Sequence, residues 1–202
     1  MHIRLAMIAL AGALGLSGTA HAIVIDSSNF TGCDGQQTCT ITQGGTSVTI
    51  TAESGASPNT ALIDIQNFAG IQGLGIQYIV TGQARDPEIQ GDPGPNGTLE
   101  ALTFAFAPSQ IITEIRLAHF YNPSQFSSDP QEVALFSGDL AASIQVLDNL
   151  GNYILGGSLS GASASLLSAD QGLWSINTAG STFGSTYIST LTFRAKNTPL
   201  GL

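Results

Sequence analysis

The sequence predicts an all-β fold, specifically an antiparallel, jelly-roll-like β-sandwich of roughly ten short strands. Short runs in which apolar and polar residues alternate recur along the chain, as expected for strands with one buried face. Turn-forming segments separate these runs, and the chain contains 24 Gly. No long segment has the period of an amphipathic helix. We therefore expect one sandwich domain over residues 23–202.

Residues 1–22 are expected to be a secretory signal peptide rather than part of this domain. Arg4 gives a basic start, residues 5–16 are apolar, and residues 20–22 (AHA) fit the small-x-small pattern of a cleavage site. The apolar run is too short for a membrane span, which needs about 20 apolar residues. The mature protein is therefore expected to be secreted or at the cell surface, with no membrane span.

The first half of the domain alternates most clearly after a Gly-Gly turn. Val48, Ile50 and Ala52 alternate with Thr and Ser beyond Gly44-Gly45, which is typical of a β-hairpin. The expected strands of this half are residues 23–26, 38–42, 47–52, 61–65 and 75–80, with the Gly-rich segment 69–75 as a linker before the last.

Residues 99–106 and 111–121 form the expected central strand pair, joined through residues 107–109. In the first run the large apolar side chains share one face of the strand: Leu102, Phe104 and Phe106.

Beyond residue 132 the β pattern continues to the C-terminal end of the domain. The expected strands are residues 133–136, 143–147, 153–155, 173–176 and 187–195. Residues 148–152 form an Asn/Asp/Gly turn, and residues 164–170 fit either a helical turn or a bulged strand. The last strand is expected to contribute Ile188, Leu191 and Phe193 to the core.

Charge and composition exclude several classes of partner. Charged residues make up 9% of the chain, the formal net charge is −9, and Lys plus Arg total 5. Such a chain lacks the basic surface that nucleic acids and anionic membranes attract. Hydroxyl and amide groups must therefore solvate most of the surface. The expected oligomeric state is a monomer.

Cys33 and Cys39 are the only cysteines, and in an exported protein their spacing predicts a local disulfide. A metal site or redox pair is the alternative, but no second pair of cysteines is present to complete one.

The acidic segment at residues 81–98 lacks hydrophobic periodicity and is the candidate cation site. Its oxygen donors are of the kind that Ca²⁺ binds: Asp86, Glu88, Asp92 and Asn96. Glu100 and Asp129 are expected to join them if the fold brings these segments together. Solvated loop acids are the alternative, because the spacing is not that of an EF-hand. Calcium is the one candidate cofactor.

No catalytic constellation is recognisable, so we expect no enzyme activity. Glu88 with Glu100, or Asp92 with Asp129, would suit a glycosidase only if the two carboxyl groups flanked a cleft. His119 is the one histidine of the expected domain, and no G-x-S-x-G motif supplies a nucleophile. A secreted hydrolase is therefore the third of three hypotheses.

The second hypothesis is a carbohydrate-binding module, and it rests on aromatic rings that could stack on sugars. Trp174 and Tyr121 are the candidate ligand-binding residues, and Tyr78, Tyr153 and Tyr187 would extend their surface. Packing in the core is the alternative role for these rings.

A resemblance to a known family rests on four short segments: residues 73–76 (GLGI), 87–91 (PEIQG), 99–104 (LEALTF) and 187–193 (YISTLTF). These segments resemble the extracellular domains of bacterial PEP-CTERM proteins, which are exosortase-processed surface proteins. The resemblance implies a non-enzymatic role in the envelope or extracellular matrix, in association with biofilm exopolysaccharide. The family's Pro-Glu-Pro motif, apolar helix and basic tail are not found at residues 197–202, so the chain is either truncated or a tagless secreted relative. Surface anchoring is therefore not carried over from the family to this chain.

Overall fold

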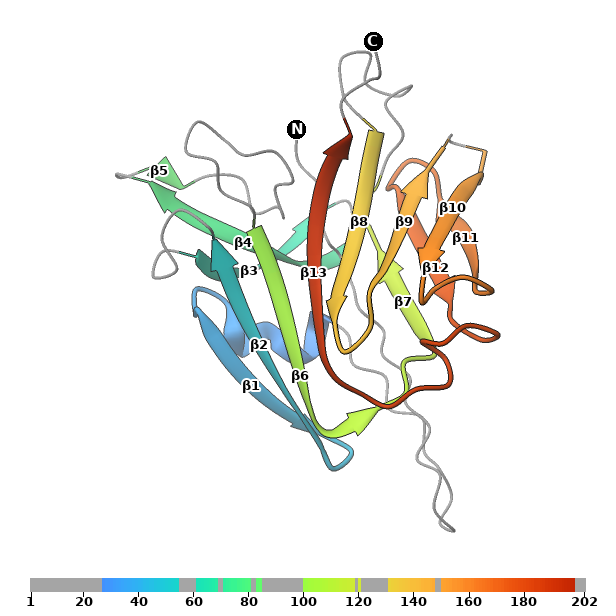
Figure 1. Ribbon diagram of the computed structural model, residues 1–202. Coiled ribbons are helices and arrows are strands. Elements are labelled where there is room, and N and C mark those ends of the chain that lie inside the picture. Colours follow the sequence, from blue (N-terminus) through green and yellow to red (C-terminus); the bar gives the residue numbers. More distant parts are fainter. Residues whose placement is uncertain are drawn as a thin grey trace.

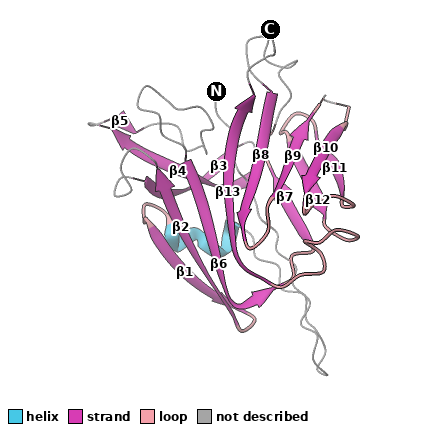
Figure 2. Ribbon diagram, viewed as in Figure 1, coloured by secondary structure: helices cyan, strands magenta, loops and turns pink. Residues whose placement is uncertain are grey.

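Antiparallel β-strands make up most of the described chain in the computed structural model of the protein (Figure 1 and Figure 2). The expected all-β, sandwich-like fold is confirmed. The structure describes residues 27–54, 61–68, 71–80, 83–84, 100–118, 120, 131–147 and 150–198. In those residues no helix is long and apolar enough to cross a membrane. The strand expected at residues 23–26 lies outside them.

The elements follow one another along the chain as a 3-10 helix and a series of strands: η1 (Ser27–Cys33), β1 (Thr38–Gln43), β2 (Thr46–Ser54), β3 (Ala61–Phe68), β4 (Ile71–Val80), β5 (Gln83–Ala84), β6 (Glu100–Gln110), β7 (Glu114–Leu117), β8 (Gln131–Gly138), β9 (Ala142–Val146), β10 (Tyr153–Gly157), β11 (Ser163–Ser168), β12 (Leu173–Asn177) and β13 (Ile188–Thr198).

These strands form two layers. The front layer in Figure 1 is a seven-stranded sheet in the order β1-β2-β6-β13-β8-β9-β10. Two three-stranded sheets, β3-β4-β5 and β11-β12-β7, lie on its far side. Tyr153 of β10 contacts Trp174 of β12 edge to face, with ring centroids 6.1 Å apart. The two layers are therefore in direct side-chain contact at this end of the sandwich.

The predicted hairpin of β1 and β2 is confirmed. Gly44 and Gly45 at its turn have φ angles of 56° and 83°, in the left-handed region that favours glycine. Two such residues in succession make the tight turn whose twist matches that of the strands it joins. Val48 and Ile50 of β2 are fully buried, as their alternation predicted.

β4 begins earlier than the sequence predicted. Residues 71–75 belong to this strand rather than to a linker, so that prediction is wrong. Gly73 and Gly75 pair with Gln66 and Asp64 of β3. Pairing along the full length of β3 therefore outweighs the weak strand preference of glycine, because strand preference depends strongly on context.

β6 and β7 are not the neighbouring pair that the sequence predicted. β6 continues through the cis Ala107–Pro108 peptide to Gln110. β2 and β13 occupy its two edges, which leaves no edge for β7. β7 instead joins the other layer and pairs with β12 through Ile115 and Leu117.

The C-terminal half follows the expected strands closely. β9 and β10 pair as the predicted hairpin. The register of β11 against β12 shifts between Leu166 and Ser168, so this segment is the bulged strand and not the helical turn. β13 is inserted between β6 and β8 at the centre of the seven-stranded sheet. The predicted core residues of β13 are buried: Ile188, Leu191 and Phe193.

Aromatic rings connect the buried faces of the central strands. Phe193 lies edge to face with Phe104 and Phe136, at centroid distances of 5.5 Å and 4.9 Å. Phe136 continues the chain of contacts to Phe183 at 6.2 Å. Edge-to-face pairs of this kind stabilise a core by more than their buried area alone. This aromatic chain joins β6, β13 and β8 to the segment that precedes β13.

Candidate functional site

The residues of the candidate calcium site lie outside the described part of the chain. The residues of this site are Asp86, Glu88, Asp92 and Asn96. Three further candidate residues also lie outside the described part: Tyr121, His119 and Asp129. Among the described residues, no group of three or more His, Cys, Asp or Glu side chains is placed to hold a metal ion. Glu100 is described and is 5% exposed at the start of β6.

The predicted disulfide joins Cys33 and Cys39, with Cα atoms 5.4 Å apart. It closes a short loop whose backbone bonds to the edge of β3. The Gly35 N–H donates to the Ile63 carbonyl at 2.9 Å, and the Ile63 N–H donates to the Gln36 carbonyl at 2.7 Å. The loop therefore covers a strand edge that would otherwise expose unpaired backbone groups.

Trp174 is a core residue and offers no ring face to a ligand. It is 1% exposed, and its indole N–H donates to the Phe120 carbonyl at 3.1 Å. Tyr153 covers one side of the ring at the contact already described. The structure thus gives Trp174 the packing role that the sequence left open as the alternative to sugar stacking.

A regular array of threonines lies on the outer face of the seven-stranded sheet over β1, β2, β6 and β13, and exposed Glu53 and Arg194 follow on the same face. We name it the threonine face, and it consists of Thr38, Thr40 and Thr42 on β1, Thr49 and Thr51 on β2, Thr103 on β6, and Thr190 and Thr192 on β13. All of these side chains are exposed or half-buried. Their strand neighbours point to the opposite face, where Ile50, Phe104 and Phe193 are buried.

Strand register aligns these threonines in rows that cross several strands. Thr38, Thr51, Thr103, Thr192 and Ser137 are successive partners across β1, β2, β6, β13 and β8. Neighbouring members of a row are about 4.8 Å apart because that is the strand spacing, and alternate residues along a strand are about 6.7 Å apart. The rows therefore repeat hydroxyl groups in two directions.

Hydroxyl groups of the threonine face are hydrogen-bonded to one another across the strands. Thr40 Oγ1 lies 2.7 Å from Thr49 Oγ1, and Thr103 Oγ1 lies 3.0 Å from Thr192 Oγ1. A hydroxyl donates one hydrogen bond and accepts two, so each pair keeps further acceptor capacity. The T-x-T spacing at residues 38–42, 49–51 and 190–192 is visible in the sequence, but only the strand order reveals that these segments share one surface.

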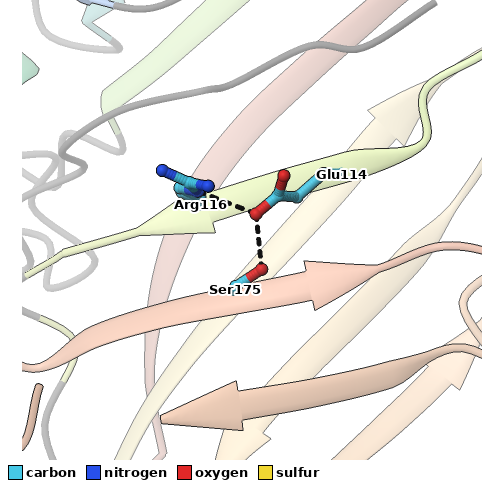
Figure 3. Close-up of polar contacts among 3 residues, drawn as sticks. All are labelled: Glu114, Arg116 and Ser175. Atoms are coloured by element: carbon cyan, nitrogen blue, oxygen red, sulfur yellow. Dashed lines mark hydrogen bonds and ion pairs between the residues drawn. The ribbon is translucent and has the colours of Figure 1, made fainter. Parts of the chain in front are cut away.

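A polar network lies on the outer face of the three-stranded sheet β11-β12-β7 (Figure 3). Glu114 Oε1 accepts hydrogen bonds from Arg116 Nε at 2.7 Å and from Ser175 Oγ at 2.6 Å. Partial burial raises the pKa of Glu114, but the hydrogen bonds from Arg116 and Ser175 outweigh it, and the net pKa is lowered. The lowered pKa makes the Glu114 carboxylate a weak base, so its hydrogen bond does not activate the Ser175 hydroxyl as a nucleophile. This network joins β7 to β12.

Asp64 is the one described group with a strongly raised pKa. It is 8% exposed, and its Oδ2 atom has no hydrogen-bond partner. Burial, followed by the negative charge of Asp34, raises the pKa of Asp64 to about 6. Asp34 itself accepts a hydrogen bond from the Ile65 N–H at 3.0 Å and belongs to the disulfide loop. Asp64 therefore releases its proton near pH 6.

No protein-family model, no curated protein and no solved structure matches this chain. The threonine face is therefore the candidate site on its own geometry, because its hydroxyl groups repeat in register across four neighbouring strands.

Proposed function

We propose that the protein is an exported, non-enzymatic component of the envelope or extracellular matrix that associates with exopolysaccharide. Export is supported by the signal-like residues 1–22 and by the Cys33–Cys39 disulfide, which is typical of oxidising compartments. The resemblance to extracellular domains of PEP-CTERM proteins supports the matrix role.

The observation that carries the proposal is the threonine face. Its rows contain hydroxyl and methyl groups and no charged side chain. A polysaccharide presents the same hydroxyl chemistry along a repeating chain, so successive sugars meet equivalent groups on successive strands. Each contact is weak because water competes for it. Many linked contacts nevertheless give a strong total attachment.

Retention of the protein in a gel that contains the polysaccharide tests this proposal. Combined replacement of Thr51, Thr103 and Thr192 by Val removes three hydroxyls of the central row and keeps the side-chain shape. We expect the polysaccharide to retard this variant several-fold less than the wild type, and we expect high salt to have little effect. The matched control replaces Ser163 and Ser165 by Ala, because these serines are exposed on β11 in the other layer. Equal retention of all three proteins would refute the proposed role of the threonine face.

A carbohydrate-binding module is the alternative that the same face favours. It would bind a defined oligosaccharide at saturable, fixed stoichiometry, whereas a matrix component would attach along long polymers only. Isothermal titration with short and long glycans distinguishes the two. A secreted hydrolase would instead release products from the polymer.

Calcium stabilisation belongs to the same proposal and is supported by the oxygen donors at Asp86, Glu88, Asp92 and Asn96. Added calcium is expected to raise the melting temperature and a chelator to lower it. An unchanged transition would remove calcium from the proposal.

A further inference from the structure

β10 ends the seven-stranded sheet and has one edge that no described strand covers. On its inner edge, the Leu147 N–H donates to the Asn152 carbonyl at 2.9 Å, next to the hairpin turn. Since hydrogen-bonded pairs alternate along an antiparallel ladder, the backbone of Ile154 faces β9. The backbone groups of Tyr153 and Leu155 therefore face outward, away from the sheet.

Within the part of the chain that the structure describes, this edge lacks the usual protection against pairing with another strand. Native sheets protect their edges with charged residues, prolines or a covering loop. The disulfide loop covers β3, and Glu114 and Arg116 mark β7 as a charged edge. Three edge strands contain neither a charge nor a proline: β10 (YILGG), β1 (TCTITQ) at the opposite end of the same sheet, and β11 (SASLLS) in the other layer. Figure 1 shows β10 and β11 at the same side of the molecule.

Exposed aliphatic side chains lie on β10, in the connection that precedes it and on β11. In the described part of the chain, four of the exposed large hydrophobic residues belong to this region: Leu147 at 38%, Leu150 at 89%, Ile154 at 52% and Leu167 at 51% exposure. Ile154 lies on the outer face of β10, because Tyr153 points inward to Trp174. An apolar group beside a free edge is the surface expected to be covered by another strand.

Low local charge allows a second copy of this acidic chain to cover the edge. The formal net charge is −9, so two copies repel each other over most approaches. Residues 140–169 contain a single charged residue, Asp148. Two copies can therefore approach each other here with little charge repulsion, while a strongly charged partner would find almost no opposite charge to pair with.

We propose that two copies associate through β10, antiparallel to each other about a two-fold axis at Ile154. Tyr153 of each copy then lies opposite Leu155 of the other, and each such pair exchanges both of its outward backbone hydrogen bonds. Ile154 lies opposite Ile154 of the second copy, so each exposed side chain covers its symmetry mate. The contact is isologous, as in most dimers, and joins the two seven-stranded sheets into one. This inference does not depend on the proposed matrix role, and it replaces the expectation of a monomer.

The dimer is expected to be weak. β10 has 5 residues, and the pairing of two such strands covers less than the roughly 1,200–2,000 Å² of a stable interface. Sedimentation velocity from about 1 µM to about 500 µM, the range in which a small interface associates, should therefore show a concentration-dependent dimer. Ile154→Lys should remove it, because it places two like charges on the axis. Thr40→Lys, on the opposite edge strand β1, is the matched control and should leave it unchanged.

A cysteine at the axis tests the register itself. Directly opposite residues that are not hydrogen-bonded have Cα atoms about 4.5 Å apart, which is within the range of disulfides. Ile154→Cys should therefore form a covalent dimer under mild oxidation much faster than Thr40→Cys. Fluorescence of Trp174 reports whether each variant is folded. A monomer at every concentration, equal crosslinking of the two cysteine variants, or a dimer insensitive to Ile154→Lys would each overturn the proposal. In the first case a strand of another protein would be the occupant of this edge.

Discussion

Replacement of Asp64 by Asn should change how the stability of the protein depends on pH. The free energy of unfolding of the variant, compared with that of the wild type, should be higher at neutral pH than at acidic pH. Asp64 is 8% exposed, its Oδ2 has no partner, and burial followed by the charge of Asp34 raises its pKa to about 6. The ordinary value is 3.8. Folding therefore favours the protonated form of this carboxyl.

The sign follows from which state binds the proton more tightly. Below the unfolded pKa of 3.8, Asp64 is protonated in both states, and its favourable contribution is fully present. As the pH rises to about 6 the unfolded chain releases the proton first, so the folded state loses stability. One pKa unit corresponds to about 1.4 kcal/mol, so the loss reaches about 3 kcal/mol by pH 7. Asn does not titrate and avoids this loss.

Urea unfolding from pH 4 to pH 7, followed by the fluorescence of Trp174, measures the effect in a chelator that removes cations. The free energy of unfolding of Asp64→Asn minus that of the wild type should rise by about 2.4 kcal/mol over this interval, because part of the loss has already occurred at pH 4. The buried amide of the introduced Asn also lacks a partner, and this costs stability. That cost does not depend on pH, so it cancels when the differences at two pH values are compared. Asp34→Asn keeps the acceptor for the Ile65 N–H and removes only the smaller cause, so its effect should be smaller. A difference that does not vary with pH would refute the reasoning.

Three other perturbations follow from the described contacts. Gly138→Ala should destabilise by about 2 kcal/mol or more, since a Cβ there would lie 2.5 Å from a β13 carbonyl. Gly151→Ala, with φ of 98° but open space, isolates the backbone strain and should cost less in the same thermal melt. Replacing both Cys33 and Cys39 by Ser should lower stability by about 2 kcal/mol, and reductant should then have no further effect on the melt. Glu114→Gln should cost less than about 1 kcal/mol in urea unfolding, because the ion pair with Arg116 is about a third exposed; a larger loss would contradict this.

The amino-acid sequence by itself determined most of the local structure. Alternation in residues 47–52 and the Gly44-Gly45 turn were sufficient for the first hairpin, because side-chain period and turn chemistry act between near neighbours. The same local rule predicted that Ile188 and Phe193 are in the core. It left two possible structures for residues 164–170, a helical turn or a bulged strand.

Tertiary structure alone decided which strands are neighbours. A period of two shows which side chains share a face of one strand, but not which strand lies beside it. β13 enters between β6 and β8 from the far end of the chain, and this aligns Thr192 with Thr103 and excludes β7 from the sheet. The burial of Trp174 and the position of β10 at the end of the described sheet have the same origin. They depend on how the two layers cover each other, and contacts between distant segments carry that information.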